Sequence, residues 1–254
     1  MRQAFGDVTA TSTDSYVAEV EMHRPPANYF DADLLTGVVE AVGWADGQGS
    51  RAVVLCSEGR HFCAGLDFGS SDTLDGALLR SLYLQAGALL ASPLPIVVAV
   101  QGSAIGGGLG LALVGDFRIG TPDSRFSANF ARLGFHQGFG ISVTLPRVVG
   151  AQRALELLTT GRRIDGTEAL RIGLCDGLAD DPRAAAHALA AEIAASAPLA
   201  VRSIRATQRA ALLSEFSGAI DHERSEQLRL MGTGDFREGI EASIERRAPE
   251  FFGS

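Results

Sequence analysis

The sequence predicts an α/β domain whose buried parallel strands end in loops of small residues that lead into helices. Two apolar, β-branched runs carry this prediction, Arg51-Ala-Val-Val-Leu-Cys56 and Pro95-Ile-Val-Val-Ala-Val100, because strands buried on both faces lack polar alternation. The loop after the second run leads into Leu111–Val114, which can continue as a helix. With 254 residues, 46% of them hydrophobic, the chain can bury one substantial core.

The first elements of the chain follow from alternation and capping. Tyr16–Glu21 alternates as a strand, and the two prolines of Arg24–Ala27 end it. Asp31 is placed to cap a helix, because the apolar residues after it have a helical spacing: Leu34, Leu35, Val38 and Val42. The polar run 68–73 is expected to form a mobile loop that acts as a lid.

The later part of the chain reads as mostly helical. Helices are predicted near 76–91 and over 151–159, on either side of the second buried run. From Pro182 onward almost the whole chain is predicted to be helical, with breaks near Pro198 and near 232–234.

Two loops at predicted strand ends have the features of an anion-stabilising site. Gln101-Gly-Ser-Ala-Ile-Gly-Gly-Gly-Leu-Gly110 follows the second run, and its glycines let a ligand approach the backbone closely. The free N–H groups of the helix start behind it carry partial positive charge. Ser57–Asp67 follows the first run in the same way. If each loop offers one backbone N–H, the pair forms an oxyanion hole that stabilises charge developing on a carbonyl oxygen.

These loops resemble the crotonase superfamily, the enoyl-CoA hydratase/isomerase family. The family has an FCAGxD loop and a GxAxGGG loop, and this chain has Phe62-Cys-Ala-Gly-Leu-Asp67 and Gly102-Ser-Ala-Ile-Gly-Gly-Gly108. The likeness continues in the family's order through four further segments: Gly115–Gly120, Leu145–Gly150, Ala169–Leu174 and Asp235–Phe251.

The resemblance implies a fold, an assembly and a substrate. It implies a crotonase-like spiral core of ββα units over 1–200 and a C-terminal helical region over 201–254 that builds a homotrimer or a dimer of trimers. The substrate would be an acyl-CoA thioester, so coenzyme A arrives as part of the substrate and no cofactor is held permanently. The Leu66 and Gly107 amides would form the oxyanion hole. The other implied substrate contacts are Pro26, Ala27, Ala64, Asp67, Gly106, Gly110, Asn129 and Phe130.

The chain departs from the family at both glutamates that the hydratases use as acid and base. One glutamate lies two residues after the triple glycine, where this chain has Gly110; the other ends an FGxPE segment, where this chain has Phe130. Isomerases of the family rely on an acid in the second segment or near Gly138, which is glycine as well. Hydration needs one group to deprotonate water and one to protonate the α-carbon. Two-glutamate hydration is therefore not expected.

Several residues near the predicted site allow two interpretations. His136 is either the acid/base group, since histidine titrates near neutrality, or a residue that shapes its loop through a carbonyl hydrogen bond. Asn129 could orient a polar substrate group or a water. Cys63 is either a nucleophile or a small buried residue. Four phenylalanines either enclose a bulky apolar acyl group or belong to the ordinary core: Phe126, Phe130, Phe135 and Phe139.

Charge and motif spacing restrict the partners. A net charge of −8 argues against nucleic-acid binding, which needs a basic surface. The phosphates of coenzyme A would then need a local basic patch, for which the candidates are Arg24, Arg60, Arg246 and Arg247. Gly106, Gly108 and Gly110 lack the spacing of a dinucleotide-binding fingerprint.

Cysteine usage and hydropathy indicate the compartment. The three cysteines show no paired spacing, which argues against a metal site or a disulfide framework and favours a reducing cytoplasm. The N-terminal segment lacks a signal-peptide core, and no apolar run reaches transmembrane length, so no membrane association is expected.

Two functions stay open at this point. The first is an enzyme that acts on an acyl-CoA by double-bond isomerisation, hydration through unusual groups, decarboxylation or C–C cleavage. The second is an acyl-CoA binding protein, without activity or weakly active, that kept the oxyanion hole and lost the acid/base pair.

Overall fold

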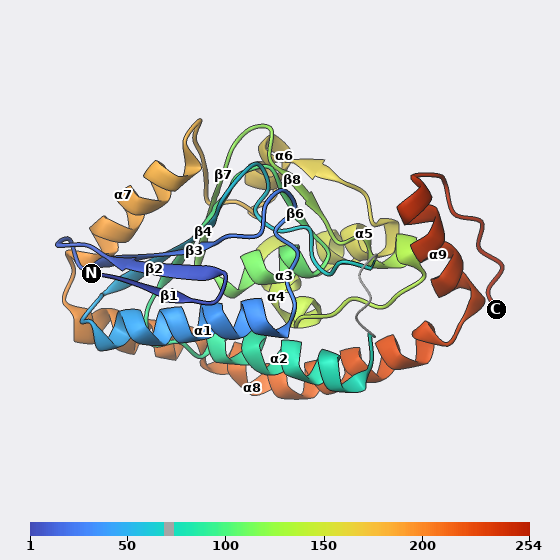
Figure 1. The fold of residues 1–254 in the computed structure, drawn as a ribbon, viewed down its shortest axis with the longest axis horizontal. Coiled ribbons are helices and arrows are strands. Elements are labelled where there is room, and N and C mark those ends of the chain that lie inside the picture. Colours follow the sequence, from blue (N-terminus) through green and yellow to red (C-terminus); the bar gives the residue numbers. More distant parts are fainter. Residues whose placement is uncertain (69–73) are drawn as a thin grey trace.

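A computed structural model describes residues 1–68 and 74–254 as a two-sheet α/β fold (Figure 1). The polar run predicted to act as a lid lies, from residue 69 to 73, outside the described residues. In the described part, the larger sheet has the strand order β1-β2-β3-β4-β5-β7-β10 and the smaller one the order β6-β8-β9.

The elements alternate along the chain as an α/β fold requires. The larger sheet is formed by β1 (Arg2–Phe5), β2 (Val8–Ser12), β3 (Val17–Met22), β4 (Ala52–Ser57), β5 (Ile96–Val100), β7 (Phe117–Gly120) and β10 (Gly177–Leu178). The smaller sheet is formed by β6 (Ser103–Ile105), β8 (Arg125–Ser127) and β9 (Ile164–Asp165). The helices are α1 (Ala32–Gly47), α2 (Gly76–Leu90), α3 (Gly107–Val114), the 3₁₀ helix η1 (Asn129–Leu133), α4 (Ile141–Val149), α5 (Ala151–Thr160), α6 (Gly166–Arg171), α7 (Pro182–Ala194), α8 (Pro198–Met231) and α9 (Gly234–Glu245).

The two apolar runs form neighbouring parallel strands, as predicted. Val54 of β4 pairs with Val97 of β5, and both strands are buried along their whole length. Val53 and Leu55 belong to the main core with α1 and α2, whereas Val54 packs with the alanines of α7. Figure 1 shows α7 on one side of the sheet and α1, α2 and α8 on the other. Because both faces are covered, polar alternation is absent from these strands.

The capping prediction for the first helix is confirmed. Asp31 has extended backbone geometry, and its carboxylate accepts a 2.8 Å hydrogen bond from the Leu34 N–H. The structure differs from the prediction at the glycine loop. β6 intervenes between β5 and the helix, and α3 begins at Gly107 itself. The glycines therefore form the start of the helix and not only the turn before it.

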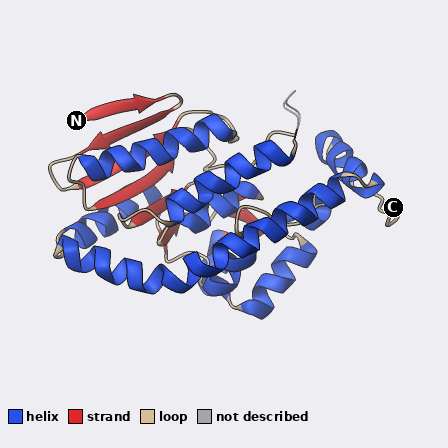
Figure 2. Cartoon of the chain, turned by 90° about the horizontal axis from the view of Figure 1, so that it is seen from below, coloured by secondary structure: helices blue, strands red, loops and turns tan. Residues whose placement is uncertain are grey.

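The C-terminal helices cover the core along its length (Figure 2). Asp116 anchors α8, because its carboxylate accepts hydrogen bonds from Arg205 Nε at 2.9 Å and Arg209 Nε at 2.8 Å. The predicted breaks are confirmed, since α7 ends at Ala194 and α9 begins at Gly234. The predicted boundary between residues 200 and 201 falls inside the first turn of α8; that division and the role in trimer formation stay predictions.

The helices of the described residues differ in length and apolar character. No single helix there is both long and apolar enough to cross a membrane, and only α7 and α8, taken together as a bent pair, meet the length and composition criteria.

Candidate active site

The loop after β4 runs beside β6. The Cys63 N–H donates to the Ser103 carbonyl at 3.0 Å, and the Ile105 N–H donates to the Cys63 carbonyl at 3.1 Å. Cys63 and Ala104 thereby form a parallel bridge. This pairing brings the end of one predicted loop against the start of α3, as the strand-end argument requires.

Gly65 allows the closest approach of the two loops. Its backbone has φ +88°, and a Cβ atom there would lie 2.9 Å from the Ile105 carbonyl oxygen and 3.3 Å from the Gly107 nitrogen. A side chain would therefore both strain the backbone and separate the loops. The Phe30 N–H donates to the Gly65 carbonyl at 2.9 Å and fixes this turn from the other side.

Leu66 and Gly107 supply backbone donors at this junction. Gly107 is the first residue of α3, so its N–H belongs to the unsatisfied first turn of a helix and carries partial positive charge. Within residues 1–68 and 74–254, no hydrogen-bond acceptor is found for the N–H of Leu66 or Gly107. Two unpartnered donors on adjacent loops are the arrangement that an oxyanion hole needs.

A cavity of about 660 Å³ opens at these two donors. The predicted substrate-binding residues that line it are Ala27, Ala64, Asp67, Gly106, Asn129 and Phe130, together with Leu66 and Gly107. Pro26 lines an adjoining cavity of about 630 Å³, which shares Ala27, Leu66 and Asp67 with the first. Most of the predicted site is thus brought together around one hollow.

Comparison with known proteins identifies the family. The family model described as enoyl-CoA hydratase/isomerase matches residues 12–254. The chain belongs to this family. A Bacillus subtilis protein named probable enoyl-CoA hydratase is 33% identical over 95% of this chain and 97% of its own length. Cyclohexa-1,5-dienecarbonyl-CoA hydratase of Thauera aromatica is 35% identical over 92% of both chains. The crystal structure of a Pseudoalteromonas atlantica enoyl-CoA hydratase/isomerase has a TM-score of 0.88, with 27% identity over 97% of this chain and 100% of that one.

Within this family fold, Gly110 lies apart from the 660 Å³ cavity. It is buried in α3 and is not among the cavity-lining residues, because the Phe139 side chain covers it. Phe130, Phe135 and Phe139 line the cavity, which favours the acyl-pocket interpretation for these three. Phe126 is only 1% exposed and packs in the core.

His136 also lies outside the set of residues that line the cavity. Its Nδ1 atom is 2.8 Å from the Gln137 carbonyl, so Nδ1 is the protonated nitrogen. Its ring meets the ring of His222 from α8 edge-on at 5.7 Å between centroids. These are contacts of a residue that shapes its loop, and the acid/base role stays a prediction.

The titratable groups that line the larger cavity are few. Among the described residues, Asp67 is the one carboxylate in that lining. Cys63 is fully buried behind the loop, and burial raises the pKa of its thiol to about 12. Cys63 therefore stays protonated at neutral pH, which favours the packing interpretation over the nucleophile. No group of three His, Cys, Asp or Glu side chains suited to a metal ion occurs among the described residues.

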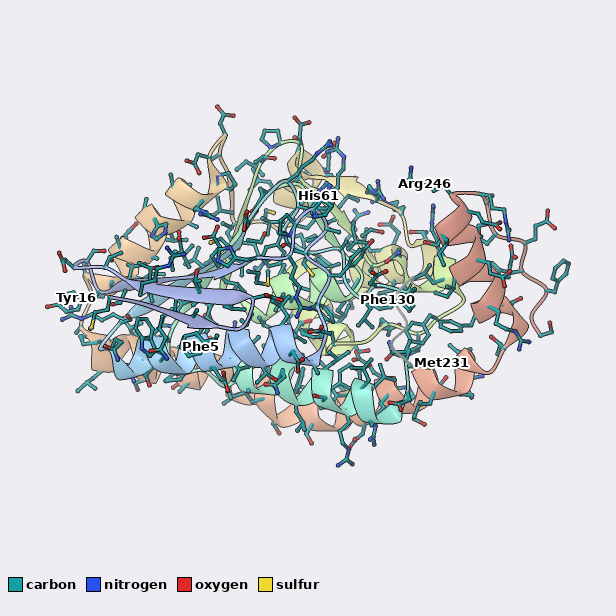
Figure 3. The ribbon with its side chains drawn as sticks, viewed as in Figure 1. Phe5, Tyr16, His61, Phe130, Met231 and Arg246 are labelled. Atoms are coloured by element: carbon teal, nitrogen blue, oxygen red, sulfur yellow. The ribbon has the colours of Figure 1, made fainter. Side chains whose placement is uncertain are left out.

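Basic residues contribute to the cavity lining. Arg163 and Arg246 line it with His61, and Figure 3 shows His61 and Arg246 both above Phe130 in that view. Burial, with the charges of Arg60 and Arg163, lowers the pKa of His61. In the described part of the chain no ion pair involves these three arginines, so their charge is available to a ligand: Arg60, Arg163 and Arg246.

Two of the four arginines proposed from the sequence are neutralised. Arg24 forms ion pairs with Asp7 at 2.7 Å and Asp31 at 2.6 Å. Arg247 pairs with Glu238 and Glu245. Arg163 was missed from the sequence, because a single arginine in a polar turn carries no signal of its own.

The cavity lining contains two further residues that sequence reasoning missed. Tyr83 of α2 and Gln227 of α8 both line it, although 144 residues separate them along the chain. Each lies inside a long helix, and helical spacing does not reveal which buried position faces a cavity.

Proposed function

We propose that this protein is an acyl-CoA-transforming enzyme that stabilises a thioester enolate through the amides of Leu66 and Gly107. The observation that carries the proposal is a pair of N–H groups, on two abutting loops at the wall of one cavity, that have no acceptor among residues 1–68 and 74–254. A thioester oxygen that accepts from both amides gains most when it becomes negatively charged, because the donors are already oriented.

The distribution of charge fits a coenzyme A ester. Arg60, Arg163 and Arg246 offer cationic groups where the phosphates of coenzyme A would enter, and guanidinium groups bind phosphate oxygens strongly. The acyl group would then extend past Leu66 and Gly107 toward the phenylalanine side chains. In this orientation the phosphates of the ligand lie near the arginines, and its acyl group lies near the apolar side chains of the same cavity.

The acyl group is proposed to be bulky and largely apolar. Phe130, Phe135 and Phe139 line this part of the cavity with Leu79 and Leu82. The relative from Thauera aromatica acts, by its name, on a cyclic dienoyl ester, which agrees with a wide acyl pocket. Reaction classes open to such a site are isomerisation, hydration through unusual groups, decarboxylation and C–C cleavage.

An acyl-CoA binding protein without turnover is the second candidate. It is favoured by the apolar residues at both glutamate places, since Phe130 replaces one acid and the ring of Phe139 covers Gly110. Only the oxyanion hole would then remain of the family's catalytic machinery.

Calorimetric binding of matched ligands tests the oxyanion hole. The probes are octanoyl-CoA and S-octyl-CoA, which differ by the thioester carbonyl. Two hydrogen bonds to that carbonyl favour octanoyl-CoA by about tenfold in Kd. Equal affinity for the two would overturn the oxyanion-hole assignment.

Turnover separates the two candidates. A panel of enoyl-, dienoyl-, cyclic enoyl- and carboxyacyl-CoA esters would be incubated with the protein and analysed by mass spectrometry. A new product from any member supports the enzyme. Preferential thioester binding with no product from the whole panel supports the binding protein.

A further inference from the structure

The apolar part of the cavity contains one polar pair. Tyr83 and Gln227 line the cavity and are only 4% and 3% exposed. Their neighbours in the lining are apolar: Leu79, Leu82, Leu133, Phe135 and Phe139. Buried polar groups in such surroundings need hydrogen-bond partners, because an unsatisfied group keeps its full desolvation cost.

The hydrogen bonds of this pair fix which atoms remain available. The His136 carbonyl can only accept, so the Gln227 atom that lies 3.0 Å from it is the Nε2 donor. Gln227 Oε1 then faces Tyr83 and accepts from the Tyr83 hydroxyl at 2.5 Å. The Phe139 backbone N–H also donates toward the Tyr83 oxygen. One N–H of Gln227 and the second lone pair of the Tyr83 oxygen are left over, a donor and an acceptor close together.

Gly138 lies against both of these atoms. A Cβ atom at Gly138 would lie 2.5 Å from both the Tyr83 oxygen and Gln227 Nε2. Gly138 lines the cavity as well, so a larger residue would push the pair out of position. Burial raises the pKa of Tyr83 above its ordinary range, so the phenol stays neutral and binds as a hydrogen-bonding group.

A tether between α2 and α8 would use the Tyr83–Gln227 hydrogen bond, with the Phe139 N–H as a further donor to Tyr83. It would leave the second N–H of Gln227 and the other Tyr83 lone pair without a partner among the described residues. A hydroxyl group on a ligand can use both of these atoms, because it donates one hydrogen bond and accepts another.

We propose that Tyr83 and Gln227 recognise a hydroxyl group on the distal part of the acyl chain, which makes hydroxylated acyl-CoA esters the substrate class. The hydroxyl donates to the Tyr83 oxygen and accepts from Gln227 Nε2. This inference rests on the proposed function, since it places the thioester of the same ligand at Leu66 and Gly107.

Matched ligand pairs test the inference in the unmodified protein. Calorimetry would compare hexanoyl-, octanoyl- and decanoyl-CoA with their ω-hydroxy counterparts, because the series brings the hydroxyl to different depths. At one chain length the hydroxyl ester binds about tenfold more tightly than the plain ester. An apolar pocket would instead favour the plain ester at every length, because the hydroxyl must be desolvated.

Substitutions test whether Tyr83 and Gln227 cause the preference for the hydroxyl ester. Tyr83→Phe and Gln227→Leu each abolish the preference for the hydroxyl ester and keep affinity for the plain ester. Phe135→Leu is the matched control in the same wall; it weakens both members of a pair alike. If a Tyr83 or Gln227 variant fails to fold, the comparison of plain and hydroxyl esters in the unmodified protein still decides whether a hydroxyl group is recognised.

The outcomes distinguish this inference from the proposed function. If plain esters bind and no ω-hydroxy ester binds more tightly, the hydroxyl recognition is wrong while the thioester site stands. The same conclusion holds if the preference survives in Tyr83→Phe and Gln227→Leu. If no acyl-CoA binds at all, both proposals fall.

Discussion

Phe139 occupies the space beside Gly110. A Cβ atom built on Gly110 would lie 2.8 Å from Phe139 Cβ and 2.9 Å from its Cδ1, closer than carbon atoms approach without a bond. Phe139 is held at φ +62°, and its ring packs on Phe30 with 5.3 Å between centroids. The glycine is therefore required by the packing of the folded protein.

Gly110→Glu should destabilise the protein rather than restore an acid. Overpacking against Phe139 is expected to cost about 1–3 kcal/mol in the free energy of unfolding, measured by urea denaturation. In a Phe139→Gly background the same substitution should cost less, because the space is free. The double-mutant cycle should give a coupling of about 1 kcal/mol or more. Additive costs would show that the two residues do not compete for space.

Crotonyl-CoA hydration should be very slow. Each missing acid/base group typically removes about 10²–10⁴-fold in rate, and neither Gly110 nor Phe130 transfers a proton. The hydration rate is measured from the loss of the enoyl-thioester absorbance. A two-glutamate hydratase at equal concentration serves as the reference. Comparable rates in the two samples would mean that another group replaces the glutamates.

The sequence was sufficient to predict the fold because its strongest signals are local. The β-branched runs, the Asp31 cap and the breaks at Pro198 and 232–234 depend on residues close in the chain. β6 was missed because three residues between glycines show no alternation, and the N-terminal hairpin of β1 and β2 was missed because β1 is largely exposed and polar.

The predicted part of the candidate site lies mostly in segments that directly follow strands. Leu66 and Gly107 follow strand ends, and strand order already suggests that such loops meet. Tyr83 and Gln227 come together through the packing of α2 on α8, and the covering of Gly110 by Phe139 depends on one backbone conformation. The spacing of residues along the chain predicts neither of these two arrangements.

Removal of the Gly107 N–H should abolish most thioester activity. Proline is tolerated at the first position of a helix and removes the donor. A Cβ at Gly107 would lie 2.5 Å from Phe30 Cζ, so both variants are made in a Phe30→Leu background. Gly107→Pro should lower turnover about 10²–10³-fold relative to Gly107→Ala, which keeps the N–H. Equal turnover of the two, with unchanged melting temperatures, would exclude this amide as a donor.

His136→Gln distinguishes a proton carrier from a loop residue. Because His136 contacts Gln137 and His222 and does not line the cavity, we expect turnover and the pH profile to persist, with reduced stability or affinity. Loss of turnover together with an inflection near neutrality would instead assign acid/base chemistry to this residue.

Glu223 should make stability fall as pH rises above 4.5. Burial raises the pKa of its carboxyl above the ordinary 4.5, although Gly140 and Ser142 donate N–H bonds to it at 2.7 and 2.8 Å. The folded state thus binds this proton more tightly than the unfolded state, so this contribution is lost between pH 4.5 and the folded-state pKa. Urea denaturation across this range, compared with Glu223→Gln, should show a falling difference; a rising one would reverse the sign of the shift.

Helices and loops contribute different parts of the cavity wall. Tyr83 and Leu82 belong to α2 and Gln227 to α8, whereas the amides of Leu66 and Gly107 belong to the loop after β4 and the start of α3. If a thioester binds at these amides as proposed, substitutions on the inner faces of α2 and α8 should change which acyl group is accepted and leave the thioester contacts in place. Laboratory evolution of the substrate range would then begin from the residues of these two helices that line the cavity.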